Sequence, residues 1–392
     1  MAKQLSGDSE TSGSGSATLK PESPGQHFED APVVSEAFLT GKPPIKPLRS
    51  VQYDLFSTFF GEAAELSNTI ELWDAIPKYA VSPRNQNALR SADNRLPVHE
   101  YRFAYATRRA GQRIESACRV AIQPASVKIA GSYIDFYPST DEELVEEVIR
   151  KIFADQQCGL HDPANTESWV RFSVQMIRKE LKARGKTRSI DEIKRSIDIL
   201  SKTHVSLFVD ETDDPVYSAP ILSDVTRVTR QKYLEDSSMT WVARLPALIS
   251  KSVNELTYRQ FNYGVLMSLT SPLARWLHKR LSHNYTNASF MDPYQTLYSS
   301  IQRDSGLLTY KRTNDNLKFL EAAFKELLKN RVLHSWERLE ERREGRKIID
   351  IKYRLCAHSD FIRDVKAANA RLKDSRSALS RTSVDKTVPS GR

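Results

Sequence analysis

The sequence feature that most restricts the fold is one long helix followed at once by two strands. Between Asn314 and Lys329, large apolar residues recur at spacings of three and four, which places them on one side of a helix: Leu317, Leu320, Phe324, Leu327 and Leu328. The segments VLHSWERL and KIIDIKYRL then read as strands, separated by the charged tip EERREG. This order predicts an α+β domain in which the helix buries its apolar side.

Two more helices are predicted just before this one. Ser271 followed by Pro272 is a helix start, because proline at the first helical position gives up no needed N–H. Its apolar side carries Leu273, Trp276, Leu277 and Leu281. Asp292 and Pro293 predict the next helix, with Leu297, Tyr298 and Ile301 facing inward and an end at Gly306. Three helices followed by a hairpin predict a winged-helix domain over residues 255–360.

The first half of the chain has a similar order of signals. Thr140 with Glu143 reads as a capping box, and Trp169–Phe172 as a short strand. A helix is expected from Ser173 to about residue 183, ending at Gly185. Ser189 with Glu192 is a second capping box, which opens a helix with Ile190, Ile193, Ile197 and Leu200 on one side. The strand HVSLFV, the turn DETDDP and a strand over 216–222 complete a predicted winged helix over residues 98–245.

The remaining segments differ in composition from these two domains. Residues 1–48 are rich in Ser, Gly and Pro with few large apolar side chains, so we expect a disordered tail. Residues 49–97 carry separate apolar clusters without sustained periodicity, which suggests an arm or linker with docking segments. Residues 361–392 are expected to form a basic C-terminal helix or tail, with disorder from 375 onward. The predicted fold is therefore α+β, with two tandem winged-helix domains and disordered termini.

The sequence matches known catalytic and cofactor-binding motifs poorly. Gly185-Lys186-Thr187 resembles the end of a phosphate-binding loop, but Glu180 occupies the position where that motif needs its first glycine. The acidic set Asp210, Glu211, Asp213 and Asp214 reads better as a polar turn than as a metal site. The eight histidines show no zinc-ligand spacing. We therefore expect a protein that is not an enzyme and that takes no cofactor or metal.

The cysteines, the lack of targeting signals and the net charge indicate where the protein acts and what kind of partner it binds. Cys118, Cys158 and Cys356 form no disulfide framework, and the sequence offers neither a signal peptide nor a membrane span, so we expect a cytoplasmic protein with no membrane partner. Lys and Arg number 58 against 49 Asp and Glu, for a net charge of +9. That excess of positive charge is compatible with a protein that binds a polyanion such as DNA. It is equally compatible with a soluble protein that is merely basic.

Basic and amide side chains gather where a helix-turn-helix meets the major groove and where a wing meets phosphates. The predicted DNA-binding residues of the first domain are Lys186, Arg188, Arg195 and Lys202. Those of the second domain are Lys311 and Arg312 just before the helix, Asn314, Asn316 and Lys318 on it, and Arg342, Arg343, Arg346 and Lys347 on the wing tip. Each could instead be part of an ordinary solvated helix face or turn. Their position in two similar contexts favours double-stranded DNA.

Residues 69–355 resemble the TrfA group of plasmid replication initiators, within the wider class of paired winged-helix Rep proteins. The most specific stretch is LTSPLARWLHKRLSH, residues 269–283, supported by WVRFS at 169–173 and FKELLKNRVL at 324–333. The first domain matches mainly in the order of its elements. The resemblance implies a protein that binds repeated sites (iterons) at a plasmid origin, helps to melt the adjacent DNA, and recruits the host initiator DnaA and the replicative helicase.

The resemblance also implies a short motif that docks on the bacterial sliding clamp. Gln52, Leu55 and Phe56 match that motif, although Tyr53 stands at its second position. Residues 70–74 lie nearer to where the family places the motif, so both segments are candidates. The third alternative is that both simply pack on the domain.

Two other functions fit parts of the sequence. A winged-helix transcription regulator is the main rival, although such a protein more often has one DNA-binding unit with a ligand domain. A primase or relaxase would need a carboxylate triad or a His-rich metal site, and the sequence shows neither. Both a monomer and a homodimer are compatible with the sequence.

Overall fold

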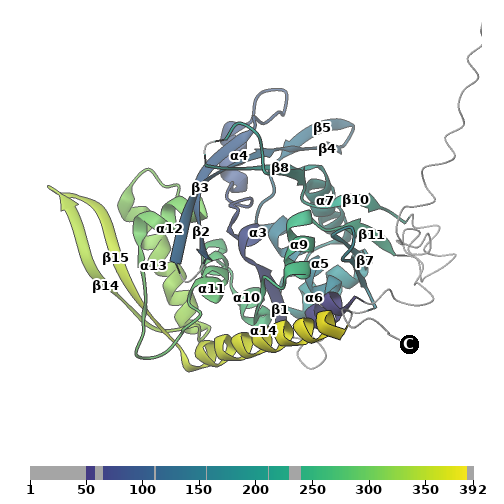
Figure 1. Cartoon of the computed structure of the whole chain (residues 1–392). Helices are drawn as coiled ribbons and strands as arrows, with labels where there is room; N and C mark the ends of the chain where they lie inside the picture. Colours follow the sequence, from purple (N-terminus) through teal and green to yellow (C-terminus); the bar gives the residue numbers. More distant parts are fainter. Residues whose placement is uncertain are drawn as a thin grey trace, which may run out of the picture. The chain divides into compact units, whose positions relative to one another are not determined.

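The computed structural model describes residues 50–57, 65–109, 112–155, 157–210, 212–228 and 240–385, shown in colour in Figure 1. All of them belong to one unit of the chain, Val34–Arg392. The tail expected over residues 1–48 lies outside the described residues, as do residues 386–392. Among the described residues, no helix combines the length and hydropathy that crossing a membrane requires.

The second half of the chain folds as a winged helix. Three helices pack on a three-stranded sheet of order β13-β15-β14, in which β15 pairs with both neighbours in antiparallel fashion. The elements in chain order are α11 (Pro272–Asn284), β13 (Tyr294–Leu297), α12 (Tyr298–Ser305), α13 (Thr313–Lys329), β14 (Leu333–Glu344) and β15 (Lys347–Ala357). Ser271 caps α11, with Pro272 at its first turn, as the sequence predicts. The leucine side of α13 is buried in the core of this domain.

One predicted helix of this domain is wrong at its start. The segment Tyr294–Leu297 is a strand, and α12 begins only at Tyr298. Strand pairing with residues 352–355 outweighs the helix-start signal of Asp292 and Pro293. Leu297 is consequently 41% exposed and does not face inward. The predicted end at Gly306 is confirmed, since this residue adopts φ = 66°, a left-handed conformation that suits glycine.

The hairpin of the second domain is longer than its sequence suggests. Most of the predicted tip belongs to β14, which runs to Glu344, and the chain turns at Gly345 and Arg346. Gly345 has φ = 58°, which explains glycine at this point. Figure 1 shows this hairpin, in yellow-green, reaching beyond α13. We call β14 and β15 the second wing.

The first half also folds as a winged helix, but with a different wing from the predicted one. Its sheet has the order β10-β11-β7-β6, so that β11 stands between β7 and β10 just as β15 stands between β13 and β14. The elements are α5 (Thr140–Phe153), β6 (Gly159–Asp162), β7 (Glu167–Phe172), α6 (Val174–Ala183), α7 (Ile190–Lys202), β10 (Ser223–Thr226) and β11 (Trp241–Arg244). The predicted fold class, α+β with tandem winged helices, is thus confirmed.

The predicted first wing is a separate hairpin. Its strands β8 (His204–Val209) and β9 (Tyr217–Pro220) join β2 (His99–Arg109) and β3 (Gln112–Gln123) in a sheet of order β2-β3-β8-β9. Residues 204–209 pair with residues 118–123, far earlier in the chain. The true first wing is formed by β10 and β11. The alternating pattern of β8 identifies a strand but not its distant partner, which is why the sequence misplaces the wing.

The helix starts of the first domain are close to those predicted. The capping box of α5 uses Ser139 and Glu142, one residue before the predicted pair. The Glu142 carboxylate accepts hydrogen bonds from both the backbone N–H and the hydroxyl of Ser139, each at 2.9 Å. The box formed by Ser189 and Glu192 at α7 is confirmed, as is the strand ending at Phe172.

The described residues between 50 and 97 are part of the folded body rather than an arm. The elements are α2 (Val51–Ser57), β1 (Leu66–Ile70), α3 (Glu71–Ala75) and α4 (Pro83–Leu89). The Tyr53 hydroxyl donates to the Phe153 carbonyl at 2.6 Å, and the Trp73 side chain is fully buried. These short segments gain their order from tertiary packing, which explains why they show no helical period of their own.

A long C-terminal helix and several small elements complete the fold. The helix α14 (Ser359–Asp385) contains residues 375–385, for which the composition suggests disorder. It contacts both β12 and α2. The small elements are β4 (Ala125–Ile129), β5 (Ser132–Phe136), α9 (Ala247–Glu255), β12 (Tyr258–Asn262) and α10 (Tyr263–Ser268). Of these, β12 pairs with β1, which links the start of the described chain to the region between the two domains.

Buried charges join α5 of the first domain to α11 of the second. Arg275 binds Glu143 with an Nη2–Oε2 distance of 2.7 Å, and Lys279 contacts both Glu147 and Asp74. Asp74 in turn binds Arg150 at 2.7 Å. Although burial alone would raise the pKa of Asp74, Arg150 and Lys279 hold it well below its usual value. These buried pairs favour one relative position of the two domains, because separating them would leave charges buried without partners.

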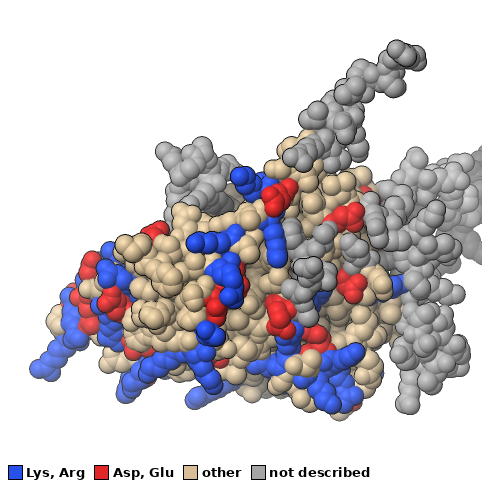
Figure 2. Space-filling model, turned by 90° about the horizontal axis from the view of Figure 1, so that it is seen from below, with Lys and Arg blue, Asp and Glu red and all other residues tan. Residues whose placement is uncertain are grey.

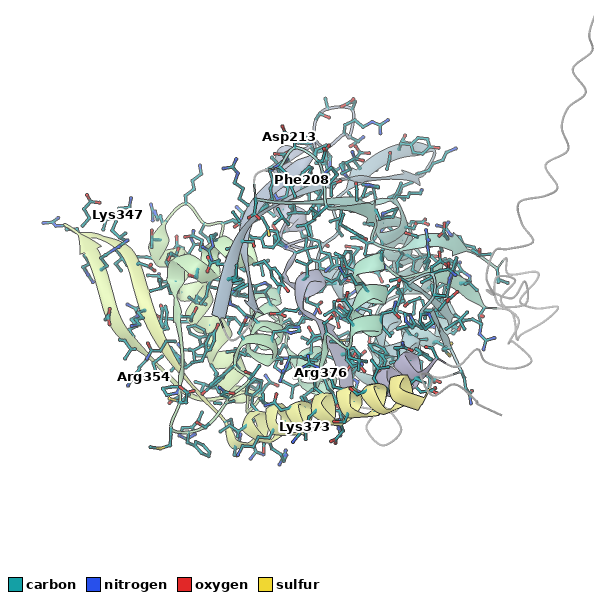
Figure 3. The ribbon with its side chains drawn as sticks, viewed as in Figure 1. Phe208, Asp213, Lys347, Arg354, Lys373 and Arg376 are labelled. Carbon is teal, nitrogen blue, oxygen red and sulfur yellow. The ribbon has the colours of Figure 1, made fainter. Side chains whose placement is uncertain are left out.

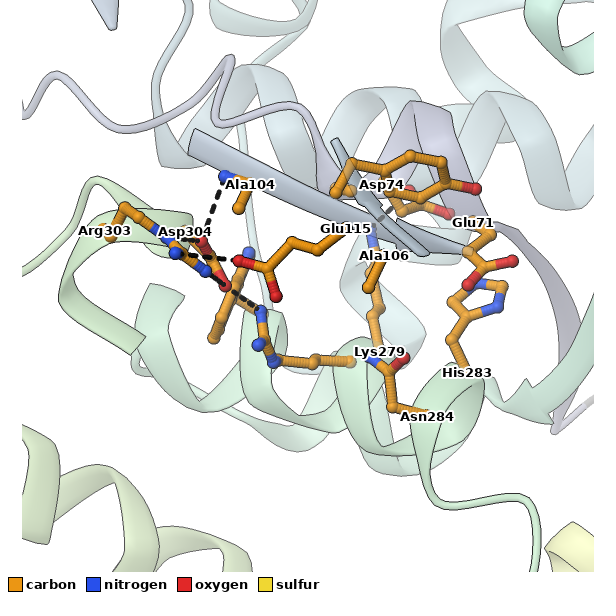
Figure 4. A pocket seen from close by; sticks show the side chains of 14 residues that line it. Glu71, Asp74, Ala104, Ala106, Glu115, Lys279, His283, Asn284, Arg303 and Asp304 are labelled. Atoms are coloured by element: carbon orange, nitrogen blue, oxygen red, sulfur yellow. Dashed lines mark hydrogen bonds and ion pairs between the residues drawn. The ribbon is translucent and has the colours of Figure 1, made fainter. Parts of the chain in front are cut away.

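A second contact joins β2 to α12 beside a pocket (Figure 4). The Ala104 N–H donates to Asp304 Oδ1 at 3.1 Å, and Arg280 Nη1 lies 2.8 Å from Asp304 Oδ2. Arg303 binds Glu115 of β3 at 2.9 Å. The cations and carboxylates that line this pocket are largely matched to one another. The pocket therefore lies at the contact between the two domains.

Candidate nucleic-acid interface

The outer face of α13 carries the clearest row of unpaired cations. Lys318, Lys325 and Lys329 are exposed opposite the buried leucines, with Asn314 one turn before Lys318. Lys311 and Arg312 are exposed at the start of the helix, where Arg312 is the N-cap residue. Within the described part of the chain, none of these five cations has an ion-pair partner. Their spacing follows from the apolar period on the other side of the helix.

Lys325 and Lys329 were not predicted. They lie in the last turns of α13, whereas sequence reasoning weighed only the N-terminal turn, the part that enters the groove in helix-turn-helix proteins. The signal was available, since both residues continue the polar face opposite the leucines.

Asn316 has a structural role instead of the predicted contact with a base. Its side chain is only 2% exposed. Its Oδ1 accepts from the Tyr310 N–H at 2.9 Å, and its Nδ2 donates to the Tyr310 carbonyl at 3.0 Å. These two bonds hold the segment that leads into α13. Asn314 is exposed, and its contact with a base stays a prediction.

The tip of the second wing carries the predicted basic set. Arg342, Arg343, Arg346 and Lys347 are all exposed, and Figure 3 labels Lys347 at this end of the hairpin. Arg343 is paired with Glu341 at 2.5 Å, whereas the other three have no ion pair in the described residues. Nearer to the body, Arg338 binds Glu321 of α13 and so ties the wing to the helix. The helix and the wing are therefore positioned together.

The basic residues predicted around α7 divide into two groups. Lys186 donates to the Leu269 carbonyl at 3.2 Å, and burial lowers its pKa; Arg188 is paired with Asp141. Both side chains thus have contacts within the chain. Lys202 is exposed and reaches the Ser126 carbonyl at 3.3 Å. Arg195 is exposed without an ion pair among the described residues, as is its neighbour Lys194, which was not predicted.

The first wing presents a different surface from the one expected. The predicted tip at Asp210, Asp213 and Asp214 is acidic and belongs to the β8–β9 hairpin. In the true wing, Arg227 follows β10 and binds Asp198 of α7. The connection to β11 carries Arg230 and Lys232 in the sequence, but it lies outside the described residues.

The segments expected to dock on the sliding clamp are packed against the first domain. Gln52, Leu55 and Phe56 lie on α2, and Phe56 is only 3% exposed, with its ring 5.3 Å from that of Phe153 and 4.8 Å from that of Tyr258. The indole N–H of Trp73, in the second candidate segment, donates to Glu146. The expected extended, accessible segment is therefore wrong, and the alternative in which both segments pack on the domain holds in this structure.

The described residues were also considered as a metal site and as a phosphate-binding loop. Among the described residues, no group of three His, Cys, Asp or Glu side chains is placed to hold a metal ion. Gly185, Lys186 and Thr187 lie between two helices, α6 and α7. A phosphate-binding loop instead follows a buried strand, so this segment has a different context.

No protein-family model matches the chain, and no curated protein matches it either. Among solved structures, it is similar to domains 2 and 3 of RctB, with a TM-score of 0.42 and 12% identity over 74% of this chain and 98% of that one. It is also similar to the Pi initiator protein in complex with iteron DNA, with a TM-score of 0.39 and 12% identity over 56% of this chain and 91% of that one. Neither likeness identifies a function for the chain.

Proposed function

We propose that this protein is a plasmid replication initiator that binds repeated double-stranded sites at an origin. The observation that carries the proposal is the outer face of α13. It presents Lys318, and Lys311 and Arg312 stand just before its first turn; none of the three has an ion pair among the described residues, while the opposite face is fixed in the core. Cations that are held in place but unpaired are the groups that gain most from meeting phosphates and guanine edges.

The second wing supports the same function. Arg338 bonds to Glu321, so the hairpin keeps a fixed position beside the recognition helix. In such an arrangement the helix reads bases from the groove while the basic tip neutralises phosphates on the flanking backbone. In the first domain, Arg195 and Lys194 of α7 provide a smaller surface of the same kind.

The finer parts of the proposal come from the resemblance to TrfA-type initiators. They are local melting of the origin, recruitment of the sliding clamp, DnaA and the replicative helicase, and action in the cytoplasm without a catalytic centre of its own. Clamp docking through Gln52, Leu55 and Phe56 requires that α2 leave its site against Phe153 and Tyr258. A winged-helix transcription regulator would share the DNA contacts but would have no need of these partners.

A mobility-shift titration tests the DNA-binding proposal. The probe is the duplex that flanks the gene, cut into overlapping fragments, and the variant combines Lys311→Ala, Arg312→Ala and Lys318→Ala. Removing one base-contacting arginine costs about 1–3 kcal/mol and relaxes specificity at one position. The matched control, Arg84→Ala with Arg102→Ala and Lys251→Ala, removes three exposed cations from other elements. Equal binding by the variant and the wild type would reject this interface.

A replication assay separates the initiator from the regulator. A plasmid that carries only this gene and its flanking repeats should replicate with the wild-type protein and fail with the α13 variant. If the variant loses DNA binding but such a plasmid never replicates with the wild type, the regulator is the better assignment.

A further inference from the structure

The most extended row of cations outside the proposed recognition surface lies on α14. Arg363, Lys366, Lys373 and Arg376 are exposed on this helix, and Arg376 lies toward β12, near Arg259. Figure 3 labels Lys373 and Arg376 on this helix, and Figure 2 looks onto the molecule from below, where Lys and Arg side chains lie interspersed with Asp and Glu. Between Ser359 and Ser380, where side-chain exposure is described, Asp374 is the single acidic side chain that is exposed.

The opposite side of α14 is anchored to both domains, so the row has a fixed position. Phe361, Ile362 and Val365 belong to the core of the second domain. Farther along, Asn369 receives a hydrogen bond from Arg259 of β12, and Ser375 is buried. At a rise of about 1.5 Å per residue, the cations from residue 363 to residue 376 cover roughly 20 Å of straight helix.

The row on α14 is continuous with the outer face of α13. Lys329 ends that face, and Arg331 follows two residues later. Arg331 Nε lies 3.0 Å from Asp360 Oδ2, and Arg363 Nη2 lies 3.4 Å from the other oxygen of the same carboxylate. Asp360 thus joins the end of the α13 row to the start of the α14 row.

We propose that α14 forms a track for the phosphate backbone of duplex DNA that extends beyond the segment read by α13. The proposal rests on the proposed DNA-binding function and extends it. Lys366, Lys373 and Arg376 have no ion pair among the described residues, and a duplex offers phosphates about every 3.4 Å along each strand. Ala367 and Ala370 lie between the cations, and their small side chains leave room for a backbone to approach. A long polyanion fits this row better than a single anion does.

The experiment compares two duplexes with the full-length protein. The short probe is the segment in which single-base substitutions weaken binding by the wild-type protein, and the long probe adds unrelated sequence on both sides. The test variant combines Lys366→Ala, Lys373→Ala and Arg376→Ala, changes that suit an exposed helix face because alanine favours helix. The control is again Arg84→Ala with Arg102→Ala and Lys251→Ala. A conservative variant, Lys366→Arg with Lys373→Arg, keeps the charges.

The wild type should bind the long probe more tightly and with a steeper dependence on salt. The α14 variant should bind both probes equally, because its slope on the long probe becomes shallower by about 0.9 for each phosphate that the helix no longer neutralises. On the short probe it should bind as the wild type does. The control and conservative variants should keep the difference between the probes.

Two outcomes would overturn the track. The α14 variant could bind both probes like the wild type, or it could lose affinity equally for both, which would place the row at the recognised segment. In the first case, loss of plasmid replication would point to an acidic protein as the partner of α14. Failure of the wild type to bind any duplex would instead reject the proposed function itself, so the two failures are distinguishable.

Discussion

Arg275 of the second domain is bonded to Glu143 of the first through two nitrogens, with Nε and Nη2 at 3.0 and 2.7 Å from the same carboxylate oxygen. Both side chains are buried, and Arg275 also donates to the carbonyls of Leu269 and Thr270. One side chain therefore closes the domain contact and holds the segment that precedes α11. Lys186, just before α7, also donates to the Leu269 carbonyl in this segment. The relative position of the two helix-turn-helix units therefore depends on the segment that precedes α11.

Removing one partner of this pair should destabilise the protein strongly. Arg275→Met leaves the buried Glu143 without its main partner, and we expect a decrease of about 3–5 kcal/mol in the free energy of unfolding. Urea titration followed by circular dichroism measures it. The double variant Arg275→Met with Glu143→Met should recover much of this stability, because no charge is then left buried. A cost below about 1 kcal/mol for the single variant would show that the pair is not important for the domain contact.

Acid should weaken the fold from about pH 6.5 downward, before most carboxylates protonate. Burial lowers the pKa of His278 and of His283 to about 3, so both imidazoles are neutral in the folded chain at pH 5. In the unfolded chain they take up protons near pH 6.5. The contribution of these neutral histidines to the free energy of unfolding is therefore fully present above pH 6.5. As the pH decreases below that value, the free energy of unfolding falls by about 1.4 kcal/mol per pH unit for each histidine.

The variant His278→Gln isolates one of these two contributions. Between pH 6 and pH 4 its free energy of unfolding should depend less steeply on pH, by about one proton. The exposed His334 supplies the control substitution His334→Gln, which should leave the slope unchanged. An unaltered slope in the His278 variant would contradict a neutral buried imidazole.

Two asparagines on α13 should respond in opposite ways. Asn316→Ala removes both bonds to the Tyr310 backbone and should cost about 1–3 kcal/mol of stability. Asn314→Ala changes an exposed side chain, so stability should stay within about 0.5 kcal/mol while discrimination at one base pair declines. Thermal unfolding and binding to single-base variants of the site measure the two effects. Similar behaviour of the two variants would reject the distinction.

Neutralising the tip of the second wing should weaken binding to all sequences alike. In the variant with alanine at Arg342, Arg343, Arg346 and Lys347, the slope of log K against log salt should become shallower by about 0.9 for each phosphate that is no longer neutralised. Arg343→Ala alone should have the smallest effect, because that guanidinium is already paired with Glu341. Titrations at several salt concentrations test this prediction, and an unchanged slope would show that the tip stays in solvent.

Phe56→Ala should destabilise the first domain by about 3–5 kcal/mol, because it removes a buried ring that packs against Phe153 and Tyr258. A clamp-binding test on the intact chain therefore needs a stability measurement beside it. A peptide covering residues 49–60 avoids this coupling, and its binding to a sliding clamp can be titrated directly. If the variant unfolds like the wild type, α2 does not stabilise the domain.

Local signals in the sequence located most helices but not the long-range pairing of strands. The leucine period of α13 and the box of Ser189 and Glu192 depend only on neighbouring residues, so both were predictable. The misplaced wing depends on which distant strand pairs with β7: it is β11, whereas β8 pairs with β3, and the local pattern of a strand does not identify its partner. The segment at Tyr294–Leu297 shows the same limit, since a partner strand outweighed a helix-start signal.

In the candidate interface, too, exposure on a helix could be predicted from the sequence, whereas contacts between distant side chains could not. The sequence placed Lys318 on the polar side of a helix and Lys311 and Arg312 just before it, and all three are exposed at these positions. It could not show that Asn316 turns back onto Tyr310, or that Arg188 meets Asp141. Those side chains have partners that become neighbours only through the tertiary fold.

The position of α14 in the chain affects how the molecule is made. Both winged helices leave the ribosome before residues 359–385, yet α14 supplies the partners of β12: Asp364 for Asn262, Asn369 for Arg259 and Arg371 for Gln260. During translation the growing chain therefore passes through a stage in which the strand between the domains lacks this cover. A message that stops near codon 358 would release a chain that lacks Phe361, Ile362 and Val365 of the second core and leaves that strand open to chaperones and proteases.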